Sequence, residues 1–130
     1  MKQFSKNWIR SKRPAKQRKF KANAPLHMKQ KFNSSKLSKP LKEKYNRRSI
    51  GLRTGDKVKI MRGQFKGRSG KVEKVMLKEE KAFISGIDVE KKDGSKAQYP
   101  IHVSNLMIED ISLDDKKRKQ KCEKNGKKSS

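Results

Sequence analysis

Residues 58–75 read VKIMRGQFKGRSGKVEKV, two apolar segments joined by a basic segment that contains glycine. In the first segment Val58 and Ile60 alternate with lysines, which is the pattern of a half-buried strand. In the second segment, which starts at Gly70, the apolar residues have mixed parity, and this predicts a bulge or a sharp bend. The stretch therefore predicts a β-hairpin whose turn covers residues 63–67.

A nucleotide-binding P-loop is excluded at the same place. That motif needs G-x-x-x-x-G-K-[ST] between a strand and a helix. Here Phe65 stands where the first glycine belongs, and Val72 replaces the Ser or Thr that would hold magnesium. The sequence that follows is β-rich rather than helical.

The hairpin tip is instead expected to contact a larger partner. Its glycines would allow positive φ and a close approach of the backbone to a phosphate or a sugar, and they are Gly63, Gly67 and Gly70. The cations expected to point from the tip are Arg62, Lys66, Arg68 and Lys71. A basic tip that is only a solvated loop is the alternative on these residues alone.

Three further strands are expected after the hairpin. Their apolar faces are Phe83, Ile87 and Val89; Ala97, Tyr99 and Ile101; and Leu106 and Ile108. Asp93-Gly94 predicts a two-residue hairpin turn, because both positions of such a turn need positive φ. Pro100 marks an edge strand or the end of a strand. Five short strands with glycine at the corners predict a mainly β fold, a small and strongly bent barrel.

Charge divides the chain into three segments. The 130 residues leave room for one domain at most. The net charge of +25 is distributed as +16 over residues 1–50, +4 over 51–110 and +5 over 111–130. With only 30% hydrophobic residues, part of the chain should be ordered only by a polyanionic partner, and nucleic acid fits best. No apolar run approaches the roughly 20 residues that span a bilayer, and residues 1–10 show no secretory signal.

The basic flanks carry aromatic residues and helix signals. Asn23 is predicted to cap a helix over 25–32 and Ser38 a helix over 40–45, with a turn between them. Ser112 and Asp115 are predicted to cap a last helix without an apolar face, which RNA or a neighbour would have to order. Five rings lie among the cations of the arm, where they would stack on unpaired bases or pin the arm to the barrel: Phe4, Trp8, Phe20, Phe32 and Tyr45.

Catalytic chemistry finds no support in the sequence. His27 and His102 have no Cys or acidic partners at metal-ligand spacing, and no nucleophile stands beside a base. Cys122 has no disulfide partner, which suits a reducing compartment, and is expected to be an incidental tail residue. The chain is therefore expected to be no enzyme and to bind no metal, cofactor or small-molecule substrate.

Residues 54–75, TGDKVKIMRGQFKGRSGKVEKV, resemble a KOW motif. The match continues through NAPLHMKQKF (23–32), LSKPLKEKYNRRSIGLRTGDKV (37–58) and KKDGSKAQYPIHVSNLMI (91–108). Together these segments are similar to the family of large-subunit ribosomal proteins numbered twenty-four in archaea and twenty-six in eukaryotes. The resemblance implies an SH3-like barrel that binds large-subunit ribosomal RNA, assembles early and lies near the outer rim of the peptide exit tunnel.

The resulting expectation is a basic RNA-binding arm with short helices over 1–49, a KOW barrel over 50–110 and a basic tail over 111–130. The expected partners are ribosomal RNA and neighbouring ribosomal proteins, on cytoplasmic ribosomes (nuclear or nucleolar during assembly in a eukaryote), without homo-oligomers or membrane insertion. The alternative function is a KOW-type transcription-elongation factor that binds polymerase or nascent RNA. The residues expected to bind RNA are Trp8, Arg10, Lys12, Arg13, Lys16, Arg18, Lys19, Lys21, Arg47, Arg48, Lys57, Arg62, Gln64, Phe65, Lys66, Gly67, Arg68 and Lys71.

Overall fold

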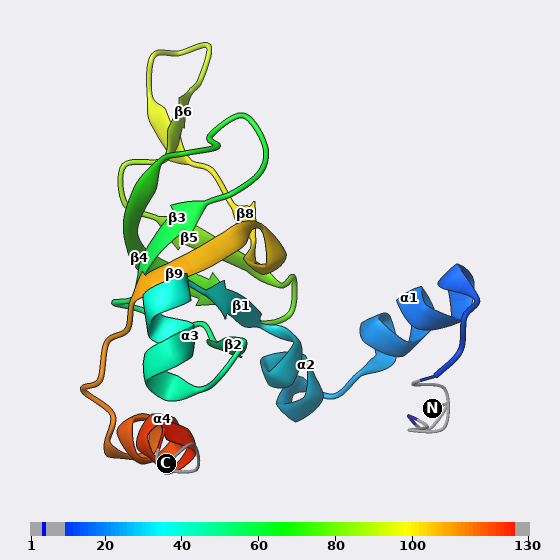
Figure 1. The fold of residues 1–130 in the computed structure, drawn as a ribbon. Helices are drawn as coiled ribbons and strands as arrows, with labels where there is room; N and C mark the ends of the chain where they lie inside the picture. Colours follow the sequence, from blue (N-terminus) through cyan, green and yellow to red (C-terminus); the bar gives the residue numbers. More distant parts are fainter. Residues whose placement is uncertain (1–3, 5–9, 127–130) are drawn as a thin grey trace.

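A computed structural model describes residue 4 and residues 10–126 of the chain. In this part the chain is rich in sheet, as predicted, with nine strands where about five were expected (Figure 1). The helices are α1 (Pro14–Asn23), α2 (Leu26–Phe32), α3 (Lys39–Tyr45), α4 (Lys116–Gly126) and the 3-10 turn η2 (Val103–Asn105). The strands are β1 (Ser34–Leu37), β2 (Ser49–Gly51), β3 (Lys57–Ile60), β4 (Ser69–Met76), β5 (Lys81–Ile84), β6 (Asp88–Glu90), β7 (Lys96–Gln98), β8 (Ile101–His102) and β9 (Leu106–Asp110).

Seven of the described strands form one bent sheet in the order β2-β1-β9-β3-β4-β5-β8. β1 pairs with β9 in parallel, and the other neighbours in this sheet are antiparallel. The bulge predicted in β4 is confirmed, because the β4–β5 register shifts between Val72 and Lys74. β6 and β7 form a separate hairpin that projects from the top of the sheet (Figure 1).

The core lies on the inner face of this sheet, where strand alternation places one apolar set. Val58 and Ile60 of β3 are buried, and so are Leu106 and Ile108 of β9, as the sequence predicted. Burying each such side chain stabilises the fold by about 1.5–3 kcal/mol. Further core residues are Leu37, Tyr45, Ile50, Leu52, Val72, Ala82, Ile84, Ile87, Ile101, Val103, Ile111 and Cys122.

The face predicted for residues 81–89 is confirmed at Ile87, which is buried, and is wrong at Phe83 and Val89. β5 buries Ala82 and Ile84, not Phe83, because a turn at Ser85-Gly86 ends the strand before Ile87 and resets the alternation. Val89 lies on the projecting hairpin and is exposed.

The hairpin predicted around Asp93-Gly94 is confirmed, but its two-residue turn is wrong. Only Gly94 has positive φ, at 83°. The Lys91 amide donates to the Ser95 carbonyl, and the Asp93 carboxylate accepts from the Ser95 amide and hydroxyl, so the loop is longer. The chain then breaks at Pro100 between β7 and β8, which confirms that this proline ends a strand.

The arm helices over 25–32 and 40–45 are confirmed as α2 and α3, but neither has a side-chain cap. Asn23 instead ends α1, a helix that the sequence did not predict. The turn predicted between α2 and α3 is wrong as well. Residues 34–37 form β1, which places Leu37 in the core between the sheet and α3.

The last helix, α4, is confirmed, and so is its cap. The Asp115 carboxylate accepts from the Lys117 amide, and this bond, with the Arg53 side chain, lowers the pKa of Asp115. The expectation that α4 lacks a partner within the chain is wrong. α4 packs against α3 (Figure 1). Cys122, far from incidental, lies in the core.

The alkylation rate of Cys122 measures whether α4 is packed against the rest of the protein in solution. Burial raises the pKa of its thiol, so the reactive thiolate is scarce in the folded protein. We expect iodoacetamide to modify Cys122 in native protein at least about tenfold more slowly than in urea-unfolded protein at the same pH, because the reaction needs local opening of α4. Equal rates in the two states would show that α4 is not docked in solution.

Candidate nucleic-acid interface

The tip of the β3–β4 hairpin is a compact basic loop over residues 61–68. The Gly67 amide donates to the Ile60 carbonyl at 2.9 Å, and the Lys66 amide donates to the Gly63 carbonyl at 3.2 Å. Gly63 and Gly67 have φ of +94° and +89°, and a Cβ at either position would meet nothing within 4 Å. The backbone at both glycines is therefore open to a close approach from outside, as predicted.

Gly70 does not share this role. Its φ is not positive, and a Cβ there would lie 2.6 Å from the Ser85 carbonyl oxygen and 2.7 Å from Cγ2 of Ile84. The glycine is needed because the end of β5 and the residue after it lie close to β4 at this point. The positive φ predicted for Gly70 is therefore wrong.

The hairpin cations fall into two groups. Arg62, Lys66 and Arg68 are exposed on the tip, and none of them forms an ion pair in the described part of the chain. Lys57 and Lys71 face one another in the β3–β4 register and lie at the base of the hairpin. Lys71 therefore does not point from the tip as the sequence predicted.

Phe65 supports the tip from inside. Its ring packs against the core and lies 5.2 Å from the ring of Tyr99, and the Arg68 guanidinium lies over the Phe65 ring at 5.4 Å. Such a stack fixes the direction of Arg68, because the planar cation is attracted to the face of the ring. Tyr99, which was predicted on the apolar face of a strand, is exposed and lies beside Phe65 at this surface.

α1 presents the arm cations on a second surface. Pro14 opens the helix, which suits its fixed φ. Arg13, Arg18 and Lys19 are exposed along it. Lys21 instead reaches the Glu80 carboxylate at 3.4 Å, and His102 contacts the same carboxylate at 3.4 Å, so the end of α1 is tied to the β4–β5 turn.

Four of the arm rings make contacts within the chain. Phe20 lies 5.0 Å from Phe4 and 6.0 Å from Phe32, so these three rings contact one another inside the arm. Tyr45 is in the core, and of these four it is the ring that pins the arm to the barrel. Trp8 lies outside the described residues.

The remaining predicted positions are distributed over both surfaces. Gln64 is exposed on the tip, Arg10 and Lys12 precede α1, and Lys16 lies on that helix, partly buried. Arg47 and Arg48 lie apart from both surfaces, between α3 and β2. Among the described residues, no cluster of His, Cys, Asp and Glu could hold a metal ion, and no helix is both long and apolar enough to cross a bilayer.

Two comparisons with known proteins show which proteins this chain resembles. The family model for the eukaryotic ribosomal protein L26 and its archaeal equivalent, numbered twenty-four, matches residues 11–125. The chain is also 50% identical over 110 residues to the large ribosomal subunit protein uL24 of Methanosphaera stadtmanae, an alignment that covers 85% of this chain and 94% of the relative. The matched range spans α1, the KOW hairpin and most of α4, and the chain thus belongs to the family of ribosomal proteins called L26 in eukaryotes and numbered twenty-four in archaea.

Proposed function

We propose that this protein is a structural component of the large ribosomal subunit that binds large-subunit ribosomal RNA through the hairpin tip and the arm. The observation that carries the proposal is the tip itself. Three cations free of ion pairs within the described chain stand beside two glycines whose backbone is open to solvent. Phosphate oxygens would be neutralised by the cations, while the open backbone would allow contact with sugars.

We also propose that the strands β3, β4, β5, β8 and β9 are an SH3-like barrel. These five strands are consecutive in the sheet, in the order β9-β3-β4-β5-β8. The 3-10 turn η2 connects β8 to β9 and returns the chain to β3. We propose a division of the chain at residues 49 and 110 into arm, barrel and tail, supported by the helices α1, α2 and α3 before this unit and α4 after it.

The expected position on the ribosome follows from the same family membership. We propose that the protein assembles early, lies near the rim of the peptide exit tunnel and acts on cytoplasmic ribosomes beside neighbouring ribosomal proteins. The comparisons lend no support to the alternative of a transcription-elongation factor. Co-sedimentation with the large subunit after a high-salt wash would support the ribosomal role, and loss from the subunit in that wash would contradict it.

Salt dependence tests the separate roles of the tip and the arm. Replacing Arg13, Arg18 and Lys19 with Gln should flatten the plot of log K against log salt by about 0.7–0.9 for each phosphate that is no longer neutralised. Replacing Arg62, Lys66 and Arg68 with Gln should flatten it similarly and should also remove the preference for cognate over scrambled RNA, because the backbone hydrogen bonds of the tip and the contact of Arg68 with Phe65 hold these cations in a defined arrangement. Affinity titrations at several salt concentrations measure both effects.

A matched control is a triple Gln variant at Lys91, Lys92 and Lys96, which removes the same charge from the projecting β6–β7 hairpin. It should retain the preference for cognate RNA. If this control loses as much preference as the tip variant, overall charge rather than the tip directs binding.

A further inference from the structure

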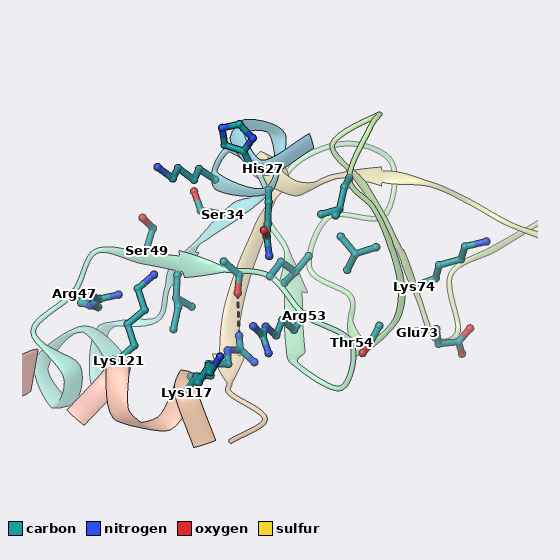
Figure 2. Close-up of a pocket in the computed structure, with 18 residues that line it drawn as sticks. His27, Ser34, Arg47, Ser49, Arg53, Thr54, Glu73, Lys74, Lys117 and Lys121 are labelled. Atoms are coloured by element: carbon teal, nitrogen blue, oxygen red, sulfur yellow. Dashed lines mark hydrogen bonds between the residues drawn. The ribbon is translucent and has the colours of Figure 1, made fainter. Parts of the chain in front are cut away.

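A third basic surface lies away from the hairpin tip and from α1. It is a groove of about 1040 Å³ between α2, β2, the far end of β4 and α4. Figure 2 shows His27 on the α2 side and Lys117 and Lys121 on the α4 side, with Ser34 and Ser49 between them. The tip adjoins Ser69 at the start of β4, whereas Val75 of the groove lies six residues later, roughly 20 Å along an extended strand.

Cations dominate the lining of this groove. Lys117 and Lys121 are four residues apart on α4 and share one face of the helix, and Lys31 comes from α2 on the other side. All three are exposed, and within the described chain none of them forms an ion pair. Glu73, the one carboxylate among the described lining residues, accepts a hydrogen bond from Gln98 and lies at the opposite end from Lys121 (Figure 2).

A buried arginine keeps the groove in shape. The two terminal nitrogens of Arg118 donate to the Asp56 carboxylate at 2.6 and 2.7 Å, and one of them also donates to the Gly51 carbonyl at 3.0 Å, the dashed line in Figure 2. These contacts join α4 to β2. Arg118 is thus a positioning residue, and the flanking Lys117 and Lys121 remain available to a ligand.

We propose that this groove binds the sugar–phosphate backbone of a second RNA segment, so that the protein joins two RNA segments at separate surfaces. The inference rests on the proposed ribosomal function. Flexible lysines neutralise phosphates as point charges, and the hydroxyls of Ser34, Ser49 and Thr54 supply hydrogen bonds to phosphate or ribose oxygens.

An acidic protein segment fits the groove less well. Protein partners usually anchor through apolar or aromatic side chains in a desolvated pocket. Here Ile50 and Leu52 are already buried in the core and Val75 and Leu77 are partly buried, while no Phe, Tyr or Trp is among the described lining residues and the most exposed of these include lysines and hydroxyls. The chemistry of the open surface matches a chain of phosphates and riboses.

Neutralising the groove tests the proposal in the full-length protein. The variant Lys31→Gln/Lys117→Gln/Lys121→Gln should lower the slope of log K against log salt for a 20-nucleotide uridine homopolymer by about 2, since each neutralised phosphate of a single strand contributes about 0.7. The Gln variant at Lys91, Lys92 and Lys96 is the control and should change the slope by less than about 0.7. Because the three groove lysines are exposed and form no ion pair within the described chain, the urea midpoint should remain at the wild-type value, which verifies folding.

The outcomes separate this inference from the proposed function. A groove variant with the wild-type slope, beside a tip variant that has lost its preference for cognate RNA, would overturn the groove and leave the proposed function intact. A groove variant and a control that lose equal slope would also overturn it. Loss of affinity for polyglutamate without any loss for RNA would assign the groove to an acidic protein instead.

Discussion

Replacing Gly70 with alanine is expected to destabilise the folded protein by about 1–3 kcal/mol, the usual cost of overpacking a close contact. The added Cβ would lie 2.6 Å from the Ser85 carbonyl oxygen. That oxygen belongs to the backbone, so relief requires β4 and β5 to separate, and the bond from the Ser85 amide to the Lys71 carbonyl would lengthen with them. A lower urea midpoint with an unchanged slope of unfolding free energy against urea is the expected measurement.

Gly51 supplies the matched control. It also lies in a strand without positive φ, but a Cβ there would be 4.0 Å from its nearest neighbour, the Asn33 carbonyl oxygen. Gly51→Ala should therefore change the unfolding free energy by no more than about 0.5 kcal/mol. If the two variants unfold at the same urea concentration, the closeness of Ser85 to β4 does not prevent a side chain at residue 70.

Sequence patterns predicted the elements whose structure depends on residues that are close together in the chain. The alternation of Val58 and Ile60 predicted β3, and the glycines and cations at 62–68 predicted the exposed tip. β1 was missed because its pairing is distant, with Leu37 opposite Ile108 in a parallel register. The four residues of β1 include two serines and have a composition typical of a turn. They form a strand because they pair with β9, some 70 positions later in the chain.

The errors at the binding surface have a similar cause. Gly70 stands among cations, as the tip glycines do. Its role, however, depends on its close contact with the backbone of Ser85, which no local pattern predicts. The groove was missed because its lysines come from α2 and α4, and in a chain with 38 Lys and Arg their positions carry no signal until the helices are placed. Arg118, one of four consecutive cations in KKRK, differs from its neighbours only by being buried.

Replacing Asp56 with alanine should have the largest effect, a loss of about 3–5 kcal/mol, because removing one partner leaves the other buried charge unpaired. Asp56 is fully buried, and its carboxylate accepts hydrogen bonds from both terminal nitrogens of Arg118. It also accepts from the amides of Arg53, at 2.9 Å, and of Ser112, at 3.0 Å. The loss should lower the urea midpoint and release α4, so that Cys122 is alkylated faster in native buffer.

Two further variants show whether the pair itself is responsible. Asp115→Ala removes a partly exposed carboxylate from the same region and costs a cap and a bond from the Arg53 side chain, about 0.5–2 kcal/mol. The double variant Asp56→Ala/Arg118→Met removes both charges and should be more stable than the sum of the single losses predicts, since no charge is left buried. Strict additivity, or slow alkylation of Cys122 in Asp56→Ala, would mean that α4 is held by its contacts with α3 and that the buried pair does not fix it to the barrel.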